Sequence, residues 1–373
     1  MIRLGWKNLI HDRMRLSVTV VGVTFSVVLM LLQSGIYFGF LDSVSGLMDR
    51  SPADVWIASS KTLNADTARA VPEETVLRVK AVPGVAWAER VSLSWAGIHL
   101  ADGTHTWVQV YGINPDTGVG GPPEMIAGSL TDLRRAGTYI IDEASLPLMP
   151  GVRVGDKIEA FGQKIEVVGM CRGVKSYSTY AVLFTSYRTA QDQLLGMEDR
   201  VSFVTAKFAE GADRGAVLER LRRLGHFDVY TSEEFHDKVR KYWGSSTGIG
   251  LGIGLTMILG FIVGVVIVGQ TMYSATVERL REYATLKAMG ATNLEICTVI
   301  WTQAIVVGVV GYVVGGLVSL GLTFTSAASV MAITLSPQVF VVIFVATAVM
   351  CLGASFLSIV RALRVDPATV FRT

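Results

Sequence analysis

The residues best suited to specific chemistry form a short charged segment, "ERLREYATLKAMGAT" (278–292), between two long apolar runs. Neither Tyr242–Val277 before it nor Ile296–Val360 after it contains Asp, Glu, Lys or Arg. Six charges lie between these runs: Glu278, Arg279, Arg281, Glu282, Lys287 and Glu295. On insertion scales, a charge at the centre of a membrane helix costs roughly 2.5–3.5 kcal/mol. We therefore expect the segment to lie in water, where the charged groups of a partner can bind it.

The sequence offers no convincing catalytic or metal-binding pattern. "GSSTG" (244–248) fits the G-x-S-x-G pattern of serine hydrolases, but it is flanked by a charged stretch and an apolar run where that site needs a strand and a soluble helix. No G-x-x-x-x-G-K-[ST] phosphate-binding loop occurs, and the five histidines lack metal-ligand spacing. We therefore expect a protein that is not an enzyme and holds no metal or cofactor of its own.

The elements that must position the charged segment are membrane spans. Of 373 residues, 51% are hydrophobic and only 17% are charged, and the mean hydropathy is +0.47. A soluble protein is nearer a quarter charged, so the composition indicates an integral membrane protein. Runs long enough to span a bilayer predict four transmembrane helices, at 16–41, 246–277, 293–325 and 337–363.

The distribution of basic residues predicts the orientation. The leader (1–15), the charged segment (278–292), the tail (364–373) and the residues just beside them carry 10 basic and 5 acidic residues. The long segment between the first two spans carries 23 basic and 26 acidic residues. Because short cytoplasmic loops are enriched in Lys and Arg, both termini and 278–292 are predicted to be cytoplasmic, with 42–245 outside. The expected location is the bacterial inner membrane, with the large domain in the periplasm.

The segment 42–245 is predicted to be one α+β domain. Alternating apolar residues indicate strands, and Gly162-Gln163 is predicted to form a two-residue hairpin turn between two of them. Asp213 as N-cap and Gly225 as stop predict a helix between them. The predicted strands cover 91–100, 106–113, 181–186 and 201–208, and the further predicted helices cover 72–84, 185–196 and 233–243, the last running on into the second span.

The second predicted span is rich in glycine. Two pairs, Gly250 with Gly254 and Gly260 with Gly264, have the small-xxx-small spacing that lets helices approach closely. One interpretation is packing against a second copy of the chain. The other is that glycine is simply common in membrane helices.

The charged segment itself is predicted to be a short helix with defined ends. Gly290 breaks it, and Thr292 with Glu295 three residues later forms a capping box that begins the third span. Leu280, Ala284 and Met289 are expected to face the membrane side. The alternative is an ordinary solvated turn.

The segment resembles a signature of the MacB/FtsX-type ABC transporter permeases, E-R-x-R-E-x-x-x-L-K-A-x-G-A, which follows the second membrane helix of that family. The tail "RALRVDPATVFR" is similar to the family's R-x-x-P-x-x-x-L-R ending, apart from Phe371, and "FTSYRTAQ" together with the chain length is most like the DevC branch. The family's layout is one span, a large outer domain and three further spans. The resemblance implies a coupling helix that docks on an ATPase subunit, formed by Glu278, Arg279, Arg281, Glu282, Lys287 and Gly290.

The resemblance further implies the permease subunit of an ABC exporter that transmits movement to its periplasmic domain. It implies a homodimer, a separate ATPase that binds ATP and Mg, a membrane-fusion protein and an outer-membrane channel. Lipoprotein-releasing and FtsX-like wall-hydrolase-regulating permeases are alternatives within the family, and a membrane-anchored sensor is an alternative from another class. The last two predicted spans lack ionisable residues, which argues against an ion-coupled transporter.

Overall fold

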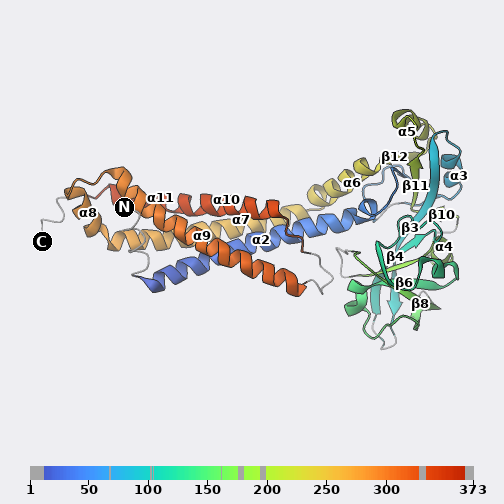
Figure 1. Cartoon of the computed structure of the whole chain (residues 1–373), viewed down its shortest axis with the longest axis horizontal. Helices are drawn as coiled ribbons and strands as arrows, with labels where there is room; N and C mark the ends of the chain where they lie inside the picture. Colours follow the sequence, from blue (N-terminus) through green and yellow to red (C-terminus); the bar gives the residue numbers. More distant parts are fainter. Residues whose placement is uncertain are drawn as a thin grey trace. The chain divides into compact units, whose positions relative to one another are not determined.

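The computed structural model describes residues 12–66, 69–100, 103, 105–160, 162–174, 180–193, 199–326 and 333–365. Its elements, followed along the chain in Figure 1, divide into two compact units. The helical unit contains the chain up to Phe38, 251–326 and the residues from 333 onward, and the α+β domain contains 39–250. Most of the predicted leader and the tail from residue 366 lie outside the described residues.

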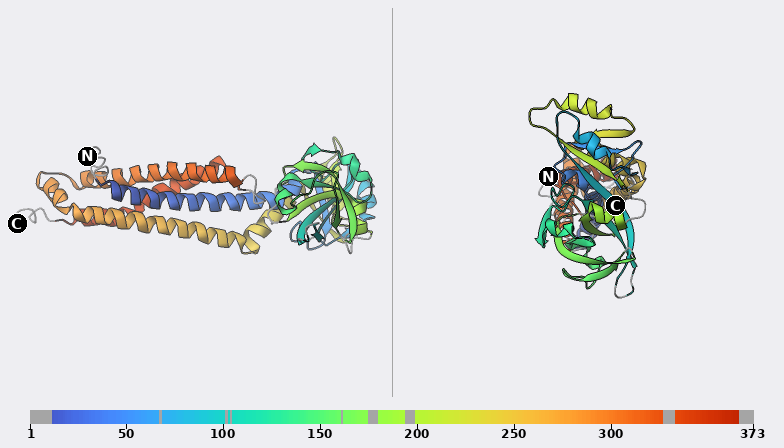
Figure 2. Two further views of the ribbon diagram at one scale, coloured as in Figure 1. Left: turned by 90° about the horizontal axis from the view of Figure 1, so that it is seen from below. Right: turned by 90° about the vertical axis from the view of Figure 1, so that its right-hand side faces the viewer.

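Four helices of the described chain are long and apolar enough to cross a membrane. They run alongside one another in the helical unit (Figure 2), and each predicted span falls on one of them. Their shared core is made of aliphatic side chains such as Val27, Val268, Ile300 and Met350. The helices are α2 (Arg13–Asp49), α7 (Ile249–Glu278), α9 (Asn293–Ser326) and α10 (Pro337–Ala354), which is followed by α11 (Phe356–Leu363).

The fourth predicted span is divided between α10 and α11. Ser336 caps the start of α10 by accepting a hydrogen bond from the Val339 amide, and Pro337 stands in the first turn, where its missing N–H costs nothing. Ser355 separates the two helices and donates its hydroxyl to the Leu352 carbonyl at 2.7 Å. The predicted span 337–363 coincides with the apolar helical run Pro337–Leu363, within which the backbone stays right-handed at Ser355.

Helix α2 ends eight residues later than the predicted end of the first span at residue 41. Its final turns are amphipathic rather than apolar throughout. Val44, Leu47 and Met48 are buried in the core of the α+β domain, whereas Asp49 is exposed. Burial of one helix face stabilises the helix beyond the point where the uncharged run stops.

The α+β domain is built on a mixed sheet with strand order β12-β1-β11-β3-β4-β9-β6-β8-β5, and β7 pairs with β3 and β8. Most neighbours are antiparallel, but β4 with β9 and β6 with β8 are parallel. The strands are β1 (Val55–Ser59), β3 (Val85–His99), β4 (His105–Ile113), β5 (Glu124–Ala127), β6 (Thr138–Asp142), β7 (Lys157–Ala160), β8 (Gln163–Arg172), β9 (Ala181–Ser186), β11 (Phe203–Phe208) and β12 (Phe227–Thr231), with β2 (Val71–Pro72) and β10 (Arg200–Val201) as a separate pair. The helices are α3 (Thr75–Lys80), η1 (Leu130–Arg134), η2 (Glu143–Leu148), α4 (Tyr187–Gln193), α5 (Arg214–Arg222) and α6 (Ser232–Lys241).

One long strand, β3, joins the two halves of this domain. Its first half pairs with β11 over Val85–Val91, and its second half pairs with β4 over Ser92–His99. Separate apolar clusters lie against the two halves, one with Val79 and Leu221 from helices α3 and α5 and the other with Val110 from β4. The predicted α+β class therefore agrees with the structure, and 15 continuous residues hold the halves together.

The predicted strands all fall on observed strands, but the predicted hairpin turn is off by one residue. Ala160 pairs directly with Gln163, so Gln163 begins β8 and is not a turn residue. Gly162 takes the second turn position with φ +70°, a conformation that glycine adopts without strain. The alternating pattern continues through the turn, so it located the hairpin but not its register.

The α5 prediction is confirmed. Asp213 accepts a hydrogen bond from the Ala216 amide as N-cap, and Gly225 follows the helix with φ +75°. The predicted helix over 72–84 is reduced to α3, because Pro72 belongs to β2. The predicted helix at 185–196 corresponds to α4, and part of its range lies outside the described residues.

The expected helix from residue 233 into the second span is not continuous. Helix α6 ends at Lys241, a π-helical turn η3 (Tyr242–Ser246) follows, and Gly248 has φ +78° before α7 begins. The cause is local, since a left-handed residue cannot continue a right-handed helix.

A buried carboxylate, that of Asp66, lies between the sheet and η3. Its Oδ1 accepts a hydrogen bond from the Gln109 amide at 3.2 Å, and its backbone carbonyl accepts one from the Trp95 indole at 3.2 Å. Burial raises the pKa of Asp66 to about 6, although hydrogen bonds from Trp243 and Gln109 oppose this shift. Between pH 3.8 and about 6, the Asp66 carboxyl therefore keeps its proton in the folded protein, whereas in the unfolded chain, where its pKa is 3.8, it has released that proton.

We predict that Asp66 makes stability fall as pH rises from about 4 to about 6, because the folded state binds more protons in that window. Asp66→Asn removes the buried charge and is expected to stabilise the protein at pH 7.5 by up to about 3 kcal/mol, but not at pH 4. Thermal unfolding of the full chain in detergent at both pH values measures this. Glu159→Gln, an exposed substitution on β7, is the control. An equal effect of Asp66→Asn at both pH values would contradict a raised pKa.

Candidate functional site

The charged segment forms a short helix, α8 (Leu280–Ala288), with defined ends. Arg279 interrupts the path from α7 with φ −101° and ψ 17°. Gly290 ends the segment with φ +96°, in the left-handed region. The Thr292 amide and hydroxyl both donate to Glu295, and the Glu295 amide donates back to the Thr292 hydroxyl. The predicted short helix is therefore present, with the predicted capping box at the start of α9 and no side-chain cap at the start of α8, and the solvated-turn alternative is wrong.

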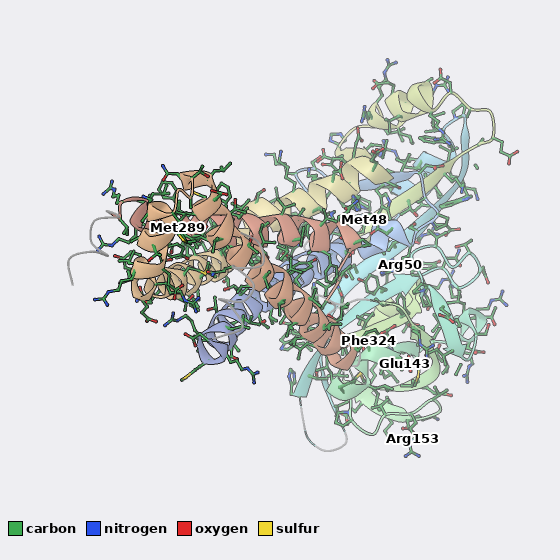
Figure 3. All side chains as sticks on the ribbon, turned by 60° about the vertical axis from the view of Figure 1, so that its left-hand side comes forward. Met48, Arg50, Glu143, Arg153, Met289 and Phe324 are labelled. Atoms are coloured by element: carbon green, nitrogen blue, oxygen red, sulfur yellow. The ribbon has the colours of Figure 1, made fainter. Side chains whose placement is uncertain are left out.

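One face of α8 is anchored in the helical unit. Ala284, which was predicted to face the membrane side, is fully buried in the helical unit, and Tyr283, which the sequence analysis did not single out, is 2% exposed. Burial raises the pKa of Tyr283 to about 12, so its hydroxyl is neutral at physiological pH. The Met289 side chain, which was predicted to face the membrane side, is 71% exposed at the turn that ends α8 (Figure 3). It lies beyond the last helical turn, so helical spacing did not determine its direction.

The six residues predicted to bind a partner are not equivalent. Glu278 binds Arg15 of α2 through two hydrogen bonds of 2.7 Å. The Lys287 ammonium donates to the backbone carbonyls of Leu363 and Val365, the second at 3.4 Å. Arg281 and Glu282 are exposed, Arg279 is half-buried, and Gly290 is exposed at the turn. Two of the predicted docking charges therefore have partners inside the chain.

A small cavity lies behind α8. Its volume is about 30 Å³, close to the space one water molecule takes in the liquid. Polar side chains line much of it, among them Asp12, Arg15, Thr19, Thr271, Arg279, Tyr283 and Gln303. It is too small for an organic cofactor. The described residues also contain no group of three His, Cys, Asp or Glu side chains that could hold a metal ion.

The two predicted glycine pairs of α7 differ in whether they face another helix of the same chain. A Cβ on Gly264 would lie 2.1 Å from the Met350 sulfur, and one on Gly260 would lie 3.3 Å from Leu29 Cβ, so both face neighbouring helices of the same chain. A Cβ on Gly254 would meet nothing within 4 Å, and Gly250 lies against the Gly244 carbonyl. Packing within the chain therefore accounts for the second pair, while Gly254 presents an open face.

Two further glycines with the same spacing escaped the sequence analysis. A Cβ on Gly311 would lie 2.5 Å from Val23, and one on Gly315 would lie 2.8 Å from Val27, where α9 crosses α2. The signal was present in the sequence, since Gly311 and Gly315 are four residues apart in a predicted span.

We predict opposite outcomes for leucine at Gly264 and Gly254. Leucine has the better helix propensity at both positions, so that contribution cancels. Gly264→Leu is expected to destabilise the chain by about 1–3 kcal/mol through overpacking, whereas Gly254→Leu is expected to leave its stability unchanged or to raise it by up to about 1 kcal/mol through helix propensity. Thermal unfolding in detergent tests this. Equal stability of the two variants would mean that α7 does not pack on α10 through Gly264.

In the α+β domain, the last turns of α2 are tied to α6. Arg240 donates to Asp42 at 2.9 Å, and both side chains are partly buried. Phe40 and Trp243 make an edge-to-face contact with ring centroids 5.6 Å apart, and His236 lies 3.5 Å from Asp49. The sequence analysis missed this pairing, because the partners are almost 200 residues apart. The available signal was opposite charge at the two ends of the domain.

Two family models match consecutive parts of the chain. The MacB-like periplasmic core domain matches residues 16–224, more than half of the chain, and the FtsX-like permease C-terminal region matches residues 252–367. The first match contains α2 and most of the α+β domain, and the second contains α8 and the three later apolar helices.

Several proteins are similar over long stretches. An uncharacterized ABC transporter permease of Mycobacterium tuberculosis is 25% identical over 96% of this chain and 95% of its own length. One from Methanocaldococcus jannaschii is 22% identical over 84% of this chain and 81% of its own length. The macrolide export ATP-binding/permease protein MacB of Paracoccus denitrificans is 27% identical over 51% of this chain, which corresponds to 29% of that protein. Among solved structures, the periplasmic region of MacB from Actinobacillus actinomycetemcomitans matches 53% of this chain and 95% of that one, with 14% identity and a TM-score of 0.40.

Proposed function

The chain belongs to the MacB/FtsX-type family of ABC transporter permeases, and we propose that it is the membrane subunit of an ATP-driven exporter whose ATPase is a separate protein. In this proposal the ATPase binds ATP and Mg, and this chain carries no catalytic residue. The relatives named as ABC transporter permeases support the choice of partner.

The observation that carries the proposal is the exposed pair Arg281 and Glu282 on an anchored helix. Buried Tyr283 and Ala284 hold α8 against the helical unit, so the neighbouring charges present a surface of fixed shape. Opposite charges side by side select a complementary partner and a single orientation. We place this surface in the cytoplasm and the α+β domain in the periplasm, on the charge distribution of the sequence and the periplasmic family match.

The proposed mechanism is the transmission of movement. Closure of the ATPase displaces α8, and the helices attached to α8 carry the displacement to the α+β domain. The unbroken course of α2 from Arg13 to Asp49 supports this, because a continuous helix is stiff. The Asp42–Arg240 ion pair joins α2 to α6 at its far end. Gly248 interrupts the second connection, so we assign the larger part of the transmission to α2.

We further propose that two copies of the chain work as a homodimer. The open face of α7 around Gly254 supports close helix contact there. A membrane-fusion protein and an outer-membrane channel complete the proposed exporter, as the resemblance of the charged segment and the tail to the family implies.

Reversing the exposed charges of α8 tests the proposed partner. In Arg281→Glu with Glu282→Lys, an interface of fixed charge pattern is left with unpaired charges, which typically costs about 2–5 kcal/mol. We expect loss of binding to the ABC ATPase that co-purifies with the wild-type chain and loss of permease-stimulated ATP turnover. Reversing Lys157 and Glu159, an exposed pair on β7, is the control. Wild-type ATPase affinity in the α8 variant would refute the docking surface.

Exchanging the charges of the Asp42–Arg240 pair tests whether movement passes between α2 and α6 through this contact. Asp42→Arg and Arg240→Asp each leave like charges opposed, whereas the double variant restores an opposite pair worth about 1 kcal/mol or less. We expect each single variant to lower permease-stimulated ATP turnover and the double variant to recover most of it. Wild-type turnover in both folded single variants would mean that α2 and α6 do not transmit movement through this contact.

A further inference from the structure

Lys287 differs from the other charges of α8 in where its ammonium group lies. It donates to the carbonyls of Leu363 and Val365, at the C-terminal end of α11. The last carbonyls of a helix have no partner within the helix. They also carry the negative end of the helix dipole, which favours a cation. Lys287 supplies both a donor and a positive charge at that point, from 76 residues away in the sequence.

Apolar contacts strengthen the same junction. Leu286 and Leu363 are half-buried against the core of the helical unit, and Ala362 and Ile359 of α11 are almost completely buried in it. The Lys287 side chain is itself half-buried. Arg281 and Glu282, one to two turns earlier on α8, are exposed instead. Helix α8 thus has two exposed charges, Arg281 and Glu282, and one charge, Lys287, that is hydrogen-bonded to another helix of the same chain.

Helix α11 is the last part of a helical run that extends from Pro337 to Leu363. It has eight residues and begins after Ser355, whose backbone stays right-handed, whose amide donates to Cys351 and whose hydroxyl bonds Leu352. Buried Ile343 and Met350 fix α10 in the core of the helical unit. The Lys287 contact therefore joins α8 directly to the end of this run.

We propose that Lys287 is a positioning residue that couples α8 to the C-terminal end of α11, and not a residue that contacts the ATPase. This inference rests on the proposed function, since it names which internal helix receives the displacement of α8. It reverses the assignment that the signature of the charged segment suggests, in which every charge belongs to the docking surface.

The test compares ATPase affinity with turnover for the full-length chain in lipid nanodiscs. The probe is the ABC ATPase that co-purifies with the wild-type chain, titrated against Lys287→Met, Lys287→Arg and Arg281→Glu. For Lys287→Met we expect affinity within about twofold of wild type and saturated turnover about tenfold lower, as expected for loss of one charge-assisted hydrogen bond. Lys287→Arg retains a cationic donor and is expected to recover most of the turnover. Arg281→Glu is expected to weaken affinity.

A second measurement, of the distance between α8 and α11, tests the inference even if Lys287→Met lowers the stability of the chain. Spin labels at Thr285 and Arg361, both exposed, report the distance between α8 and α11. We expect one narrow distribution in the wild type with and without ATPase, and a broader one in Lys287→Met when the ATPase binds. The inference is overturned if Lys287→Met weakens affinity as Arg281→Glu does while saturated turnover and the distance stay unchanged. Unchanged affinity in Arg281→Glu and in the double α8 reversal would refute the docking surface itself, which is a different outcome.

Discussion

Charged side chains are costly in hydrocarbon, and this cost explains how charge is distributed in the helical unit. The apolar helices α7, α9 and α10 contain almost no charge within their length, and their charges collect at the ends and on α8. A charge at the edge of such a bundle has two favourable environments, water or an internal partner. Glu278 and Lys287 have internal partners, whereas Arg281 and Glu282 are exposed. The same physical pressure therefore produces both an anchored helix and a surface that a partner can recognise.

The glycines show how the bundle is assembled once charge is excluded from it. In a membrane the hydrophobic effect does not drive helices together, so close van der Waals contact must do so. Gly264, Gly311 and Gly315 bring backbones close enough that a methyl group would collide with a neighbouring helix. Gly254 has the same local spacing and no neighbour in the chain. Close helix packing within this chain and the open face of α7 at Gly254 thus use the same residue type.

The α+β domain depends on different physics. Its long strand β3 serves two halves, and apolar clusters fill the space beside each half. Burial of Asp66 beside η3 puts a carboxyl with a raised pKa close to where the chain leaves the domain. The protein retains this unfavourable group within a network that includes Gln109 and Trp243. The pairing of α2 with α6 through Asp42 and Arg240 lies in the same domain, with His236 and Asp49 as a second polar contact between these helices.

The sequence by itself determined the features that depend on local patterns. Run length located the four apolar helices, Gly290 and the Thr292–Glu295 box defined where the charged segment ends and α9 begins, and Asp213 with Gly225 defined α5. Only the tertiary structure decided which residues meet across the fold. It bound Glu278 to Arg15 from 263 residues away and Lys287 to the end of α11, and it distinguished Gly264 from Gly254. The physical reason is that hydrogen-bonded turns and caps involve neighbours within about four residues, whereas the partner of a charge or of a glycine depends on which helix faces are brought together by packing.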